Sequence, residues 1–246
     1  MEGQHTERRS QTKSRSDRHD RNRIECRGHL ACGGRGADFV AQIPLDPCVY
    51  EHPIDLAAEL DPLAHYCEGC PANVLGRPFG CTGAIDYPIS AVGERWLLDQ
   101  LPGIDQPLVW LLLRQGVQEL GYDGAPVEPL RANPAYFEER RVAGRDLVEF
   151  VMTANQVFEM LFLLGNIEPA HAGVLLLLFG AIPREVEAGQ IVQIMNRTLT
   201  EEDIVRDFPF QMRVSELDDN TVAGLKDFFF ALHRAWTLGV PLLLDV

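Results

Sequence analysis

Residues 168–180 read Glu-Pro-Ala-His-Ala-Gly-Val-Leu-Leu-Leu-Leu-Phe-Gly, and this stretch decides the fold. A proline in the first turn and a glycine at the end are the usual limits of an α-helix, so the sequence predicts a helix over about 168–179. Its residues are apolar almost all round, which is typical of a helix buried at the centre of a bundle. The segment is much shorter than the roughly 20 apolar residues that a membrane-spanning helix needs.

Further helices are predicted wherever a capping residue precedes a stretch of helical periodicity. The predicted caps are Ser90, Asp105, Asn133, Asp146, Thr200 and either Asp218 or Asp219. The Asp146 cap is followed three residues later by Glu149, which is the pattern of a capping box. The last and longest of these helices runs to Gly239 and carries large apolar residues at core spacing.

Short strands near both ends of the ordered chain complete a predicted α+β fold. Runs rich in strand-forming residues predict strands over 38–45, 83–88, 208–214 and 241–246. We expect residues 1–36 to form a disordered basic tail and residues 37–246 to form a single globular domain. Within that domain, residues 37–89 are expected to be an irregular cysteine-containing, metal-binding lobe, and residues 90–246 a helical body with a C-terminal strand.

The net charge of −14 is distributed unevenly along the chain. Residues 1–35 carry about +4, so the remainder of the chain carries about −18. An acidic body repels nucleic acids and anionic membrane surfaces at long range, so we expect neither of them as a main partner. The N-terminus lacks the apolar stretch of a secretory signal, and we therefore expect a cytoplasmic protein.

The clearest candidate for chemistry is the segment His65-Tyr-Cys67-Glu-Gly-Cys70, with Cys81 a short distance further along. Zinc in proteins takes four thiolate or imidazole ligands, arranged as a tetrahedron at about 2.0–2.3 Å. A Cys-x-x-Cys pair supplies two of them from one tight turn, and Gly69 can adopt the positive φ that such a turn often requires. We therefore predict a structural zinc site with Cys67, Cys70 and Cys81 as ligands and His65 as the nearest fourth ligand.

The fourth ligand and the kind of metal stay open at this point. Cys48, His52 or Asp86 could take the place of His65. An iron–sulfur cluster is the second interpretation, and it prefers four thiolates. A redox-active dithiol is the third, although Pro71 directly after the pair is atypical of the helix start that lowers a thiol pKa. The simplest alternative is that these cysteines are ordinary packed residues.

Other patterns give no comparable signal. Glu168 and His171 have the spacing of a di-iron bundle ligand pair, but there is no second Glu-x-x-His, so an exposed first helical turn is favoured. No nucleophile elbow, phosphate loop or dinucleotide fingerprint occurs. We therefore expect a binding or regulatory module that acts through a protein partner or as a homo-oligomer. The alternative is a redox or hydrolytic enzyme whose iron–sulfur or open metal site lies between the cysteine lobe and the helical body.

Overall fold

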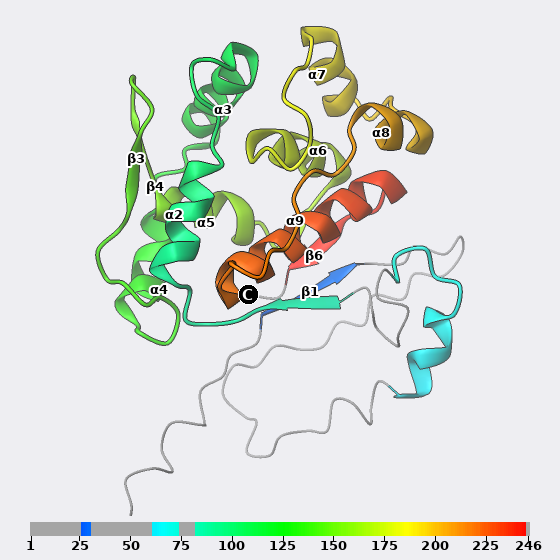
Figure 1. The fold of residues 1–246 in the computed structure, drawn as a ribbon, viewed down its shortest axis with the longest axis horizontal. Helices are drawn as coiled ribbons and strands as arrows, with labels where there is room; N and C mark the ends of the chain where they lie inside the picture. Colours follow the sequence, from blue (N-terminus) through cyan, green and yellow to red (C-terminus); the bar gives the residue numbers. More distant parts are fainter. Residues whose placement is uncertain (1–25, 31–60, 74–81, 245–246) are drawn as a thin grey trace, which may run out of the picture.

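Residues 26–30, 61–73 and 82–244 are described by the computed structural model of the chain (Figure 1). Their fold is α+β, as predicted, because helices make up about half of it and all of its strands are short. None of the helices in these ranges is long and apolar enough to cross a lipid bilayer. The strand predicted at 38–45 lies outside the described residues, as do residues 1–25 and 31–36 of the predicted tail.

A four-stranded antiparallel sheet joins segments from the two ends of the described chain. Across the sheet, the strands are β2 (Thr82–Ile85), β1 (Cys26–Leu30), β6 (Leu242–Leu244) and β5 (Asn166–Ile167). β1 is a central strand, because Gly28 lies opposite Gly83 of β2 on one side and opposite Leu244 of β6 on the other. β2 and β6 confirm the predicted strands near 83–88 and 241–246, whereas β1 lies within the segment that we expected to be a disordered tail.

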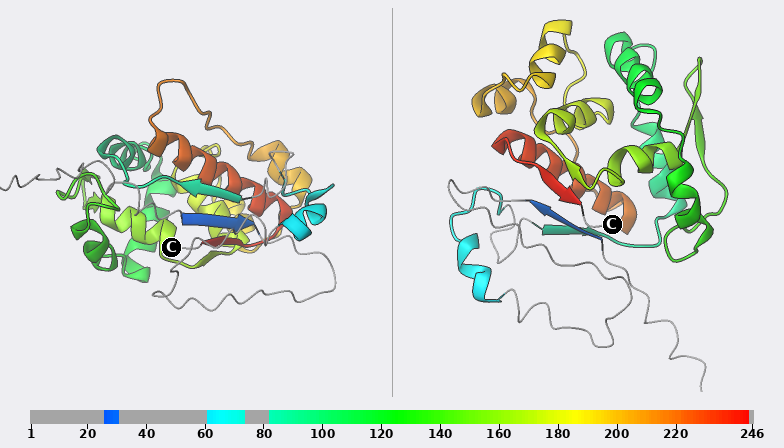
Figure 2. Two further views of the ribbon diagram at one scale, coloured as in Figure 1. Left: turned by 90° about the horizontal axis from the view of Figure 1, so that it is seen from below. Right: turned by 180° about the vertical axis from the view of Figure 1, so that it is seen from behind.

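The helical body packs on this sheet through its last helix. In chain order, the helical segments are η1 (Asp61–Cys67), α2 (Ala91–Asp99), α3 (Pro107–Leu120), η2 (Ala125–Val127), α4 (Glu128–Ala132), α5 (Ala154–Phe162), α6 (Pro169–Leu178), α7 (Ala188–Met195), α8 (Glu201–Asp207) and α9 (Asn220–Leu238). α9 runs along one face of the sheet, and α6 packs against α9 (Figures 1 and 2). A separate hairpin of β3 (Gly144–Asp146) and β4 (Val151–Thr153) flanks α2.

The central position of α6 confirms the prediction made from its apolar sequence. Most of its side chains are buried, including every leucine from 175 to 178. Gly173 lets α6 approach its neighbours closely: a Cβ atom there would lie 2.6 Å from Ile194 Cγ2 and 2.9 Å from Trp236 Cε2. The hydrophobic core is therefore built around the contact of α6 with α7 and α9.

The N-termini of α2 and α9 are joined through their capping residues. Ser90 Oγ accepts a hydrogen bond from the Gly93 N–H at 2.9 Å and donates one to Asp219 Oδ2 at 2.5 Å. Asp219 in turn caps α9 by accepting from the Val222 N–H at 2.8 Å. The Ser90 cap is thus confirmed, and Asp219 is the residue that caps α9. Two helices from distant parts of the sequence begin at one shared set of hydrogen bonds.

The polar helix predicted from Asn133 to Arg141 is wrong, since residues 133–143 contain no helix. Asn133 Oδ1 instead accepts a hydrogen bond from the Ala135 N–H at 3.0 Å, a local turn that competes with helix formation. Phe137 pairs with Ile89 in an isolated parallel bridge. The chain at this point is therefore fixed by a tertiary contact rather than by its own helical preference.

The capping box predicted at Asp146 and Glu149 is also wrong, because both residues lie in the β3–β4 hairpin. Asp146 Oδ1 accepts a hydrogen bond from the Val148 N–H at 2.8 Å, which favours a turn over a helix start. The capping box that does begin α5 is formed by Thr153 and Gln156: each side chain accepts from the other residue's backbone N–H. The predicted helix therefore exists but begins later.

Two smaller differences concern a helix start and a strand. Pro107 lies in the first turn of α3 as predicted, but the predicted cap at Asp105 is wrong: Gln106 precedes the helix, and no side chain caps it. Residues 208–214 are irregular and belong to no strand of the described sheets. This segment is held to the body by the Gln211 N–H, which donates to the Ala181 carbonyl at 2.8 Å.

A buried ion pair holds α2, α4 and α5 together. The Arg131 guanidinium donates to both carboxylate oxygens of Glu94, at 2.8 Å and 3.0 Å, and its Nε donates to Asn155 Oδ1 at 2.5 Å. The guanidinium also lies over the Phe137 ring, 4.1 Å from its centroid. Glu94 and Arg131 are 1% and 3% exposed, so neither charge is solvated by water and each depends on the other.

Candidate metal site at the cysteine turn

The Cys-x-x-Cys segment forms a tight turn directly after the 3-10 helix η1. The Cys70 N–H donates to the Cys67 carbonyl at 3.3 Å, which closes a four-residue turn. Gly69, at the third position of this turn, has a φ of +68°, a value that favours glycine. The prediction that Gly69 adopts a positive φ is therefore confirmed, and Cys67 and Cys70 stand at the two ends of one turn.

Asn73 ties this turn to the one that follows it. Its N–H donates to the Cys70 carbonyl at 3.0 Å, and its side-chain Nδ2 donates to the Cys67 carbonyl at 3.1 Å. The backbone carbonyls of both cysteines are therefore held by one residue. The Asn73 Oδ1 atom is buried and accepts no hydrogen bond from the residues that the structure describes. A buried acceptor without a donor lowers the stability of the folded state, because it loses its hydrogen bonds to water and gains none in the protein.

The double turn is fastened to the helical body by Arg234 of α9. Arg234 Nε and Nη2 both donate to the Pro71 carbonyl, at 3.0 Å and 2.8 Å. The Ala72 side chain is 1% exposed, and Cys70 packs against the hydrophobic core. The cysteine turn is thus anchored in the fold, although 163 residues separate Pro71 from Arg234.

The structure places two of the predicted thiol ligands and leaves one outside the described residues. Cys67 and Cys70 are both half-buried. Cys81 lies outside the described residues, but Thr82, the next residue, begins β2. Figures 1 and 2 show that β2 begins at the end of the sheet that faces η1. From Thr82 the chain runs along β2 away from η1 and on to α2 (Figure 1).

His65, the predicted fourth ligand, is exposed on the last turn of η1. Its Nδ1 lies 2.8 Å from the Pro62 carbonyl, so Nε2 is the ring nitrogen that could bind a metal. Within the described ranges, no three His, Cys, Asp or Glu side chains are grouped so that they could hold a metal ion. The structure therefore does not bring His65 and the two thiols into a three-ligand set.

The described residues add no alternative ligand to the cysteine turn. Cys48 and His52 lie outside the described residues, and Asp86 is exposed just after β2. Glu168 and His171 are both exposed at the start of α6, as expected for an ordinary first helical turn. Glu168 Oε1 accepts a hydrogen bond from Asn166 Nδ2 at 3.3 Å. Nothing in the described part of the chain completes a di-iron ligand set around them.

Asn73 and Arg234 are the residues of this site that sequence reasoning missed. Asn73 carries a detectable signal, because an asparagine three residues after a turn cysteine can bond back to the backbone. Arg234 carries no such signal, because it lies in a long helix far along the sequence and only the tertiary fold brings it to Pro71.

The chain was compared with protein-family models, curated proteins and solved structures. No protein-family model, no curated protein and no solved structure matches the chain. The interpretation of the site therefore rests on its own residues.

Proposed function

We propose that this protein is a binding or regulatory module whose cysteine-containing lobe is held by a structural zinc ion. The proposed ligands are Cys67, Cys70 and Cys81, with His65 as the fourth. Three thiolates and one imidazole form a common closed set for structural zinc, which stabilises a fold and leaves no coordination position for a substrate. The zinc ion would link the turn after η1 to the chain that enters β2.

The observation that carries this proposal is the anchored Cys67–Cys70 turn. A glycine with positive φ and two backbone-fixed cysteine carbonyls support a pair of thiols presented by a rigid turn. The Pro62 carbonyl beside His65 Nδ1 supports the fourth ligand, because metal-binding histidines usually donate their second ring N–H to a carbonyl or carboxylate. The buried Asn73 Oδ1 supports a further group near the turn.

The outer face of the same turn supports a role in binding. Tyr66 is 71% exposed, and its ring lies beside that of His65, with the centroids 4.0 Å apart. Exposed tyrosines are enriched among the residues that dominate protein interfaces. We therefore assign this face to contact with a protein partner or with a second copy of the chain.

Cobalt reconstitution tests the ligand set. Cobalt(II) binds tetrahedral zinc sites, and thiolate ligands give it characteristic charge-transfer absorption. We expect such absorption from the wild-type protein, its loss in Cys67→Ser and Cys81→Ser, and its retention in Cys26→Ser as the matched control. If Cys67→Ser and Cys81→Ser kept the wild-type cobalt spectrum, the proposed ligands would be wrong.

The absorption of anaerobically purified protein separates zinc from an iron–sulfur cluster. Zinc adds no visible colour, whereas an iron–sulfur cluster gives a broad band at about 400 nm. Such a band, together with bound iron, would contradict a zinc clip and favour the enzyme alternative.

A further inference from the structure

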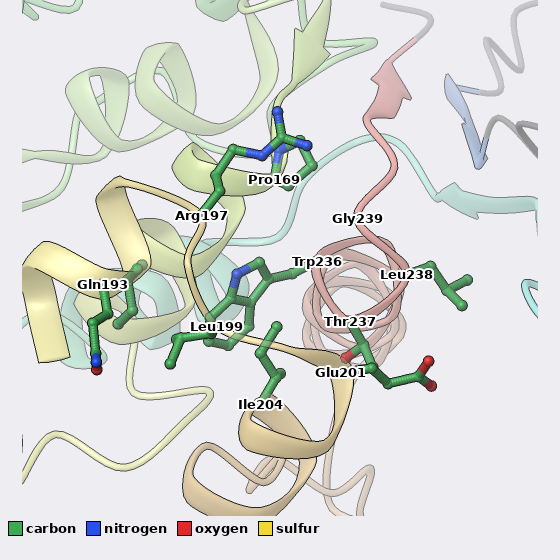
Figure 3. Close-up of a pocket in the computed structure, with 11 residues that line it drawn as sticks. Pro169, Gln193, Arg197, Leu199, Glu201, Ile204, Trp236, Thr237, Leu238 and Gly239 are labelled. Atoms are coloured by element: carbon green, nitrogen blue, oxygen red, sulfur yellow. The ribbon is translucent and has the colours of Figure 1, made fainter.

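A second site, separate from the cysteine turn, lies at the opposite end of the helical body from the β3–β4 hairpin. It is a pocket of about 270 Å³ between the start of α6, the end of α7, the start of α8 and the last turn of α9 (Figure 3). Its lining combines apolar side chains, such as Leu199 and Ile204, with a few polar groups. Small-molecule sites in proteins have this mixed composition.

Trp236 provides the first indication of what the pocket binds. Its side chain is 4% exposed and packs against the rings of Phe208 and His233. No hydrogen bond from its indole Nε1–H to another residue is present in the part of the chain that the structure describes. In Figure 3, the indole nitrogen is on the edge of the ring toward Arg197. Because this donor lies at the pocket and is not sealed in the core, it is available to a ligand that carries an acceptor.

Arg197 provides the second indication. It follows α7 with a φ of +57°, at the position after the helix end where glycine is favoured. The turn there is closed by the Thr198 N–H, which donates to the Gln193 carbonyl at 3.1 Å. An arginine retained in this strained conformation places a cation beside the pocket. No carboxylate among the described residues pairs with it.

The start of α6 adds further positive potential. Arg197 and Pro169, the first residue of α6, both line the pocket, and in the view of Figure 3 the guanidinium is drawn over Pro169. The side chain of Glu168, which precedes it, makes no capping hydrogen bond to the first turn, so the backbone N–H groups there are not satisfied by a cap. Glu201 is the acidic residue of the lining, but its carboxylate points away from Trp236. Arg197, the Trp236 N–H and the first turn of α6 therefore supply hydrogen-bond donors to the pocket.

We infer that this pocket binds a small organic carboxylate. Arg197 and the Trp236 indole N–H hold the carboxylate group, and the first turn of α6 adds its dipole. Leu199, Ile204 and the neighbouring apolar lining contact the hydrocarbon part of the ligand. This pocket shares no residue with the proposed zinc ligands, so the inference does not depend on the proposed function.

The test uses the indole N–H resonances of the full-length protein, labelled with ¹⁵N-tryptophan. The Trp236 resonance is assigned from its absence in Trp236→Phe, and the resonances of Trp96 and Trp110 serve as internal controls. The probes are benzoate and hexanoate, their neutral amides, and inorganic phosphate. We expect a saturable shift of the Trp236 resonance with benzoate or hexanoate only.

Two variants at one position separate binding from folding. Arg197→Gln keeps a side chain in the strained conformation but removes the charge, and Arg197→Gly removes the charge while relieving the strain. We expect both to weaken carboxylate binding by at least about tenfold, the loss expected for a charge-assisted hydrogen bond. Arg197→Gly should remain as stable as wild type, or become more stable.

Any of four results would overturn the inference. The first is that neither benzoate nor hexanoate shifts the Trp236 resonance, and the second is that the amides bind as tightly as the acids. The third is that phosphate alone shifts the resonance. The fourth is that both Arg197 variants bind the carboxylate with wild-type affinity.

Discussion

Arg234 on α9 donates two hydrogen bonds to the Pro71 carbonyl, so the cysteine turn and the longest helix of the body form one unit. Because the acceptor is a backbone carbonyl, the contact holds the main chain at Pro71 in place and does not depend on the side chain there. Any metal held by the turn would consequently be tied to α9, and through α9 to the sheet and to α6.

Removing this contact should loosen the cysteine turn without unfolding the body. In Arg234→Gln, we expect faster hydrogen exchange of the Cys70 and Asn73 amides, with a loss of about 0.5–1.5 kcal/mol in local stability. Arg206→Gln is the matched control, because the ion pairs of Arg206 are surface pairs with Asp203 and Asp207 of its own helix, α8. Equal protection of both amides in wild type and Arg234→Gln would show that the contact does not hold the turn.

The buried Glu94–Arg131 pair should be the most sensitive polar contact in the body. In Glu94→Gln, the Arg131 charge is left buried without a counter-charge, and we expect a loss of about 3–5 kcal/mol in the free energy of unfolding. The double variant Glu94→Gln/Arg131→Met should lose much less than the sum of the two single variants. Urea denaturation followed by circular dichroism measures all of these values. Additive losses would mean that the two side chains do not depend on each other.

Two glycines within helices should respond to alanine in opposite directions. At Gly173, the new methyl group would collide with Ile194 and Trp236, and we expect a loss of about 1–3 kcal/mol. At Gly116 in α3, no atom lies within 4 Å of the new Cβ position, and we expect a gain of about 0.5–1 kcal/mol from helix propensity. Thermal unfolding gives both changes. A Gly173→Ala variant as stable as wild type would show that α6 has room to shift.

His233 should make the stability of the fold depend on pH. Burial lowers the pKa of His233 below its usual value of 6.5, against the opposing effect of its hydrogen bond to the Phe208 carbonyl. The unfolded chain therefore takes up a proton before the folded one does. As the pH falls through 6.5 toward the lower folded pKa, stability is lost, with a slope of at most about 1.4 kcal/mol per pH unit.

His233→Gln is the variant that isolates this effect. Glutamine can keep a donor toward the Phe208 carbonyl, but it does not titrate. We expect the stability of the variant relative to wild type to rise as the pH falls through 6.5. Parallel pH profiles of the two proteins, measured by urea denaturation, would show that His233 titrates equally in the folded and unfolded chains.

Local signals in the sequence were sufficient for much of the helical body. The side chains of Ser90 and Thr200 cap their helices by hydrogen bonds to backbone N–H groups three residues further on, and Pro107 lies in the first turn of α3. A linear sequence pattern reveals such local features. The glycine after α9 likewise ends that helix in the left-handed conformation. The apolar run at 168–179 also predicted correctly that α6 lies at the centre of the core.

The failures came where another contact outweighs the helix signal in the sequence. Asp146 has the sequence of a helix cap, but its side chain accepts from the Val148 N–H inside the β3–β4 hairpin. At Asn133 the competing contact is distant, because the Phe137–Ile89 bridge takes the place of the predicted helix. At the candidate metal site, the turn and the positive φ of Gly69 follow from local residues, whereas its attachment to Arg234 depends on the whole fold.

Metal content is the most direct test of the central proposal that this turn belongs to a zinc site. Full-length protein purified without oxygen should contain one zinc ion per chain by elemental mass spectrometry, and the Cys67→Ser/Cys70→Ser variant should contain none. Wild-type protein without a bound metal, or a double variant that keeps its zinc, would contradict the account.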